Sequence, residues 1–174
     1  MRSAAPFAAL AALAASAACS PNLDWRAFEP EGSGVVVSFP CRPDRQARSV
    51  PLAGETVRME VLVCSAGGTT FALGFADLAD PARIGPALAE LRSVAAANIG
   101  AARPTATPVV VPGMTPNAEA GRVTLSGRKP DDSPIEQQAI FFTKGLRVYQ
   151  ASVIGTPIPP EAAATFLGAP TFVR

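Results

Sequence analysis

The sequence predicts an α+β fold, in which one long helix and a short C-terminal helix pack on an antiparallel sheet of about six strands. Short apolar runs alternate with polar residues, as in strands that have two different faces. The chain has 18 prolines and 14 glycines, and many of them stand between these runs, where they supply turns. One stretch, 88–99, has apolar residues at helical spacing instead.

The N-terminus has the pattern of an export leader. Arg2 is the only charged residue before Asp24, and the 15 residues of 4–18 are apolar except for Ser16. A membrane-spanning helix needs roughly 20 apolar residues, so a permanent transmembrane anchor is not expected. We expect a signal peptide at 1–18, a tether at 19–22 and a single α+β domain at 23–174.

Two cleavage sites compete at the end of this leader. Ala15 and Ala17 form an A-x-A site, and cleavage there would release a soluble periplasmic or secreted protein. The letters SAAC at 16–19 resemble the lipobox of bacterial lipoproteins, in which the cysteine becomes the first residue and carries acyl chains. In that system, a serine such as Ser20 after the cysteine permits sorting to the outer membrane.

The cysteine count favours lipidation of Cys19. The chain has three cysteines, and acylation of Cys19 leaves Cys41 and Cys64 as an even pair in an oxidising compartment. We therefore expect a lipoprotein on the periplasmic side of the cell envelope, with simple secretion as the alternative.

The N-terminal half reads as a series of strands. Residues 35–39 alternate as a first strand that ends at Pro40. Residues 56–64 alternate most clearly, with four apolar residues on one face and Arg58 and Glu60 on a face that we expect to be wet. The next strand places its apolar residues on one face: Phe71, Leu73 and Phe75.

A hairpin centred on Ala53 and Gly54 would pair Pro43 with Cys64. Cys41 would then lie beside Cys64, within the Cα separation of about 5.5–6 Å that a disulfide needs. We expect a structural disulfide rather than a redox-active pair, because the spacing is not C-x-x-C and the chain has no histidine to activate a thiol.

The long helix is predicted after Asp80 and Pro81, which form a typical helix start, and before Gly100, which suits a C-terminal cap. Its apolar stripe would contain Leu88, Leu91, Val94 and Ile99.

Beyond a proline-rich connection, the sequence predicts a three-stranded meander. Val123 and Leu125 mark the first strand, 135–143 the second and 146–154 the third. The connecting turns fall at 130–133 and 144–145, and a short helix follows at about 160–167.

Composition excludes several classes of chemistry. The chain has no histidine, which removes Ser-His-Asp and Cys-His catalysis and histidine metal ligands. It has no phosphate-binding loop and no dinucleotide fingerprint, so we expect no cofactor, no metal site and no catalytic residues. Without Arg2, 14 basic residues balance 14 acidic ones, and this argues against nucleic-acid binding.

Arg42, Arg45 and Arg48 recur at every third position beside the predicted hairpin. They are candidates for contact with lipid headgroups or an acidic partner. The alternative is a solvated strand edge, where charge discourages aggregation.

Three segments carry a resemblance to a known family: VVVSFPCRP at 35–43, KGLRVYQASVIG at 144–155 and EAAATFLGAPTF at 161–172. They resemble the PsbP-like α/β/α sandwich superfamily and, more closely, its poorly characterised bacterial lipoproteins with an FP-x-x-P signature. The resemblance implies an α/β/α sandwich and a role as an accessory or assembly factor, and it supplies no catalytic residues.

We therefore expect a non-catalytic binding or assembly module that contacts an envelope protein or the membrane surface. The alternative is a periplasmic carrier of a small apolar ligand, held in a pocket between the sheet and the helix.

Overall fold

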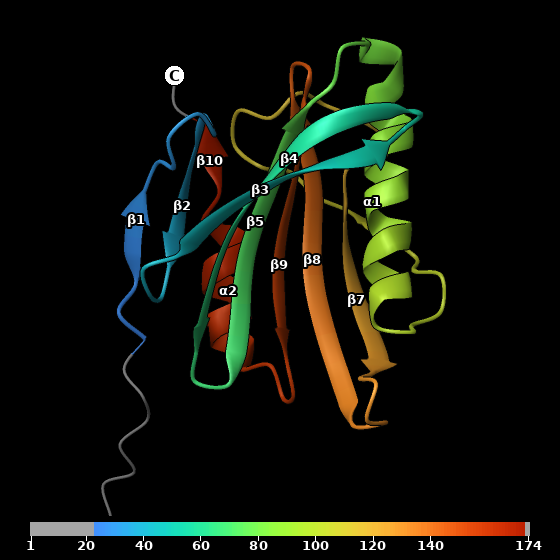
Figure 1. The fold of residues 1–174 in the computed structure, drawn as a ribbon. Coiled ribbons are helices and arrows are strands. Elements are labelled where there is room, and N and C mark those ends of the chain that lie inside the picture. The colour runs from blue at the N-terminus through green and yellow to red at the C-terminus, as the bar shows by residue number, and fades with distance from the viewer. Residues whose placement is uncertain (1–22, 173–174) are drawn as a thin grey trace, which may run out of the picture.

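The computed structural model describes residues 23–172 and shows an α+β fold built on two antiparallel sheets (Figure 1). The seven-stranded sheet has the order β3-β4-β5-β9-β8-β7-β6, and the three-stranded sheet has the order β1-β2-β10. The bounds of the large sheet, in that order, are Asp44–Leu52, Glu55–Ala66, Thr69–Asp77, Arg147–Gly155, Pro134–Lys144, Gly121–Arg128 and Thr107–Pro108. The small sheet consists of Arg26–Phe28, Val35–Phe39 and Thr171–Phe172.

Two helices cover opposite faces of the large sheet. A 3-10 turn at Pro81–Arg83 leads into α1, Ile84–Asn98, and α2 spans Pro160–Gly168. One buried cluster joins α1 to its face of the sheet, and the other joins α2 and β2 to the opposite face. The prediction of one long and one short helix on an antiparallel sheet is confirmed. The strand count of about six is too low, since the described part of the chain has ten strands in two sheets.

The β3–β4 hairpin has the predicted turn and register. Leu52 pairs with Glu55, and the register from Asp44 opposite Val63 places Pro43 opposite Cys64. Ala53 has a positive φ of 51° in the turn. Side chains of α1 and of the 3-10 turn before it hold this strained turn. The Ala53 N–H donates to Glu90 Oε2 (2.8 Å), and the Ala53 carbonyl accepts from Arg83 Nη1 (2.8 Å).

Two expectations about faces are wrong. Arg58 and Glu60 share their face of β4 with Leu62 and Cys64, which are buried, so this face is wet only toward the turn. The reason is that β2 and α2 cover the rest of it. Val94 is 46% exposed, because the buried stripe of α1 continues from Leu91 to Ala95 and leaves Val94 at its edge.

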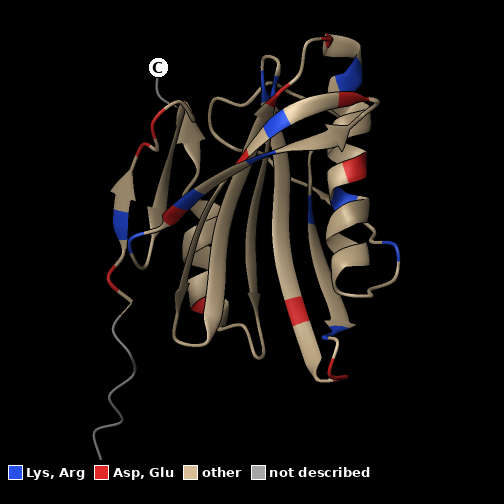
Figure 2. Ribbon diagram, viewed as in Figure 1, with Lys and Arg blue, Asp and Glu red and all other residues tan. Residues whose placement is uncertain are grey.

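Charge is distributed unevenly over this framework. Figure 2 shows charged residues on β1, β3, β4 and α1, whereas the central strands β5 and β9 carry one each, Asp77 and Arg147. No helix within residues 23–172 is long and apolar enough to cross a bilayer.

Candidate functional site

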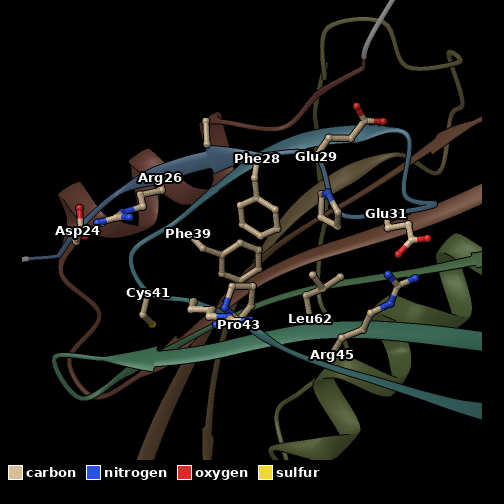
Figure 3. A pocket seen from close by; sticks show the side chains of 13 residues that line it. Asp24, Arg26, Phe28, Glu29, Glu31, Phe39, Cys41, Pro43, Arg45 and Leu62 are labelled. Atoms are coloured by element: carbon tan, nitrogen blue, oxygen red, sulfur yellow. Dashed lines mark hydrogen bonds and ion pairs between the residues drawn. The ribbon is translucent and has the colours of Figure 1, made fainter.

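A cleft of about 750 Å³ lies between β1 and the start of β3. Small-molecule sites usually measure about 300–1,000 Å³, so this cleft is large enough for a ligand. Figure 3 shows the cleft opening between the β1–β2 hairpin and the hairpin of the large sheet.

The floor of the cleft is apolar. Phe28 from β1 and Phe39 from β2 point into it, with ring centroids 5.7 Å apart, and Leu62 from β4 lies beneath them (Figure 3). Phe39 and Leu62 are almost fully buried and belong to the core that joins α2 to the sheet. The floor is therefore part of the core, and the apolar surface left for a ligand is that of the half-buried Phe28, Cys41 and Pro43 above it.

The disulfide lies at one end of this floor. Cys41 and Cys64 are bonded, with their Cα atoms 6.0 Å apart, and Cys41 lines the cleft. The bond ties the loop between β2 and β3 to the buried face of β4. It therefore fixes the backbone at Arg42, the next residue and a cationic part of the lining, relative to the floor.

Arg42 and Arg45 line the cleft, whereas Arg48 does not. Arg45 is paired with Leu62 and Arg48 with Met59, and these partners lie on opposite faces of the sheet. The predicted set of three arginines is thus divided, because a spacing of three residues in a strand alternates between faces. Arg48 is an exposed residue of an edge strand.

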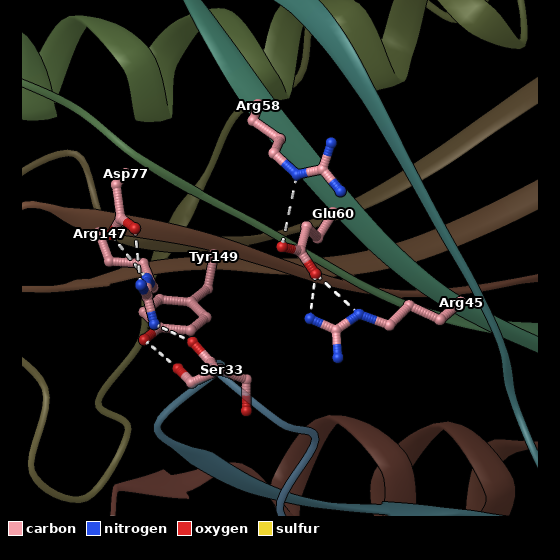
Figure 4. A network of polar contacts seen from close by, with 8 residues as sticks. Ser33, Arg45, Arg58, Glu60, Asp77, Arg147 and Tyr149 are labelled. Atoms are coloured by element: carbon pink, nitrogen blue, oxygen red, sulfur yellow. Dashed lines mark hydrogen bonds and ion pairs between the residues drawn. The ribbon is translucent and has the colours of Figure 1, made fainter.

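An ion pair orients Arg45. Its Nε donates to Glu60 Oε2 at 2.7 Å, and its Nη2 contacts the same oxygen (Figure 4). Arg58 Nε lies 3.8 Å from the other oxygen of Glu60. One carboxylate is thus shared by two guanidinium groups, and this group of three retains a net positive charge beside the cleft.

A second network fixes the opposite, acidic wall, which contains Glu31. Arg147 holds Asp77 through two hydrogen bonds of 2.7 and 2.6 Å and also donates to the Gly32 carbonyl (Figure 4). The Tyr149 hydroxyl donates to the Ser33 carbonyl at 2.7 Å. The turn that follows Glu31 is thereby fastened to the large sheet. Burial raises the pKa of Tyr149 above its ordinary value.

The mouth of the cleft has one further ion pair. Arg26 donates to Asp24 Oδ2 at 2.9 and 2.6 Å, and this hydrogen bond, with the attraction of the carboxylate, raises the pKa of Arg26. Of the charged residues that line the cleft, Arg42, Glu29 and Glu31 make no ion pair within residues 23–172.

The sequence did not indicate the β1 side of this cleft. Arg26–Phe28 is too short to show an alternating pattern, and its pairing with β2 is formed across a turn. Cys19, the predicted lipidation site, lies outside the described residues. Among residues 23–172, no three histidine, cysteine, aspartate or glutamate side chains are grouped to hold a metal ion.

A smaller groove lies where the sequence predicted a pocket between the helix and the sheet. It measures about 230 Å³ and is lined by Leu91 and Val94 of α1 and by Met59, Val61 and Gly74 of the sheet, among others.

Comparisons with known proteins do not assign the chain to a family. No family model matches it, and no curated protein is significantly similar to it.

Proposed function

We propose that this protein is an exported, lipid-anchored module of the bacterial cell envelope, which binds another envelope component through the cleft beside β1 and does not catalyse a reaction. The cleft is the observation that carries the proposal. It combines a preformed apolar floor with fixed charged walls, which is how binding sites combine affinity with orientation.

Sequence and structure support this proposal at separate points. The leader and the cysteine arithmetic support export, and the Cys41–Cys64 bond is typical of an oxidising compartment. The layers of helix, sheet and helix are compatible with the PsbP-like sandwich that the three segments resemble. That resemblance supports an accessory or assembly role.

The alternative of a small-ligand carrier with its pocket between sheet and helix has less support. The groove at α1 measures about 230 Å³, below the usual range of about 300–1,000 Å³ for small-molecule sites. The larger cleft lies on the other face of the sheet.

Site-specific photo-crosslinking in intact cells tests the proposed site. A photoreactive phenylalanine analogue replaces Phe28, whose side chain points into the cleft, and a matched variant carries it at Ala164, an exposed position on α2. We expect a defined crosslinked product from position 28 that is absent from position 164. Equal products from both positions, or none from position 28, would contradict the proposal.

Lipidation is tested separately, by mass spectrometry and membrane fractionation of wild type and Cys19→Ser. We expect an acylated wild-type protein in the membrane fraction and a variant without acyl mass in the soluble fraction. The same soluble, unacylated product from both would show that the anchor is wrong while leaving the cleft to its own test.

A further inference from the structure

We propose that two copies of this protein associate through the outer edges of their β3 strands, which pair antiparallel about a two-fold axis at Ala47. The two seven-stranded sheets then form one continuous sheet. This inference goes beyond the proposed function, because it concerns the border of the sheet and a second copy of the chain. Three observations carry it: the length and exposure of β3, the direction of its backbone donors and the charges on one of its faces.

Strand β3 is an exposed border of the large sheet (Figure 1). It has nine residues, and all of those at 44–49 are exposed. The opposite border, β6, has only two residues and includes Pro108, which has no N–H. A long edge strand with unpaired backbone groups is a template for another strand. β3 is therefore the border at which this sheet can be extended.

The hairpin turn determines which backbone groups of β3 point away from β4. Ala53 and Gly54 both have positive φ, 51° and 79°, as in a two-residue type I′ turn. In such a hairpin the flanking residues, Leu52 and Glu55, exchange two hydrogen bonds, and every second pair along the ladder does the same. The N–H and C=O groups of the intervening residues of β3 therefore point to the outer edge.

These outward-facing residues are Arg45, Ala47, Ser49 and Pro51. Pro51 has no N–H, and none of the other three donates its N–H to a backbone oxygen within residues 23–172. The three donors lie symmetrically about Ala47. A two-fold axis at Ala47 places Arg45 opposite the partner's Ser49 and the two Ala47 residues opposite each other. Each of these pairs exchanges two hydrogen bonds, so all three outward donors are satisfied.

The charges on the α1 face of β3 complement each other across this axis. Asp44 and Arg48 make no ion pair within the described part of the chain. They lie roughly 13 Å apart along one strand, too far to pair with each other. In the proposed register Arg48 is opposite the partner's Gln46, and the right-handed twist brings it diagonally close to the partner's Asp44. Symmetry generates this ion pair twice, and Arg48 stays accessible on the face of the sheet.

Other two-fold registers satisfy fewer of these groups. An axis at Arg48 places two arginines directly opposite each other, which is destabilising. An axis at Ser49 places Ala47 opposite Pro51, which has no N–H. An axis at position 46 keeps the ion pair but places Ser49 opposite Pro43, which precedes the strand and also lacks an N–H. The residues of β3 therefore favour pairing about Ala47.

Disulfide crosslinking of the full chain in its own membranes tests this register. Ala47→Cys and Ser49→Cys form a matched pair, because both residues are exposed on the same face of β3. In the proposed dimer the two Cα atoms at position 47 are about 5.5 Å apart, within the range of a disulfide, whereas those at position 49 are roughly 14 Å apart.

Two differently tagged copies of each variant are expressed together, and the oxidised membranes are analysed without reduction. We expect about tenfold more linked product that contains both tags from position 47 than from position 49, because of this difference in distance. Equal yields, or a higher yield from position 49, would overturn the inference.

Exchange of the two charges tests the ion pair in the acylated protein, solubilised in detergent, by sedimentation at several concentrations. Asp44→Arg and Arg48→Asp should each raise the dimer dissociation constant about fivefold, as for the loss of two exposed ion pairs. The double variant Asp44→Arg/Arg48→Asp exchanges the charges within each pair and should restore the wild-type constant. Wild-type protein that is monomeric at every concentration, or single variants with an unchanged constant, would refute the proposed dimer.

Discussion

Removal of the disulfide should destabilise the protein by an amount that depends on the length of the loop that the disulfide closes. Cys41 and Cys64 are separated by 23 positions, so the bond closes a loop of 24 residues in the unfolded chain. In the chain-entropy account this closure is worth about 3.5 kcal/mol. The Cys41→Ala/Cys64→Ala variant should lose that stability while keeping the fold, because the β3–β4 register is also set by the two-residue turn at its other end.

Urea unfolding measures this loss. With a slope of about 2–3 kcal/mol per molar urea, the midpoint should fall by about 1–2 M. A reducing agent should lower the wild-type midpoint to that of the double variant and leave the variant unchanged. The reasoning is refuted if reduced wild type, with both thiols shown to be free, unfolds at the same urea concentration as the oxidised protein.

Three further substitutions or titrations test the packing and the polar network. Phe166 is fully buried between two aromatic rings at 5.0 and 5.4 Å, so Phe166→Ala should cost about 3–5 kcal/mol in urea unfolding, and a loss below about 1 kcal/mol would contradict the described core. A Cβ on Gly127 would lie 1.9 Å from a backbone oxygen at the end of α1, so Gly127→Ala should destabilise the protein by about 1–3 kcal/mol. Gly168 has open space around it, so the control Gly168→Ala should change stability by less than about 0.5 kcal/mol. Tyr149 is the only tyrosine, and its pKa is raised by burial, so the tyrosinate absorbance should titrate at higher pH in the native protein than in urea. Because folding favours the protonated hydroxyl, the stability that this group contributes is complete below its unfolded pKa of about 10 and is lost as pH rises through its native pKa. If the native and unfolded proteins titrate at the same pH, the hydroxyl is not buried.

Local patterns predicted the elements that depend on local signals. The turn at Ala53 and Gly54 needs two residues with positive φ, and the alternation on either side of it allows few other registers. Asp80 caps the 3-10 turn by accepting from the Ala82 N–H, and Gly100 adopts the positive φ expected after a helix. Within residues 23–172, local patterns thus predicted the two helices and the hairpins whose strands are joined by short turns.

The parts that were not predicted depend on contacts between distant segments. β10 has two residues and pairs with β2, more than 130 positions earlier in the chain, so no local pattern could reveal it. This pairing belongs to the small sheet, which covers part of the β4 face that contains Arg58 and Glu60. The sequence had predicted that this face is exposed to solvent. The cleft combines residues 24–31, 39–45 and 62, and only Arg42 and Arg45 of the predicted contacts belong to it.

The occupancy of the cleft in its native setting is the most direct test of the account. Arg42 and Arg48 are both exposed in the described structure, but only Arg42 lines the cleft. An arginine-specific reagent, applied to intact envelopes and to the purified protein, reports on both residues after digestion and mass spectrometry. We predict that Arg42 is protected in the envelope and reactive in the purified protein, whereas Arg48 reacts in both. Equal reactivity of Arg42 in the two settings would contradict the central claim that this cleft binds an envelope component.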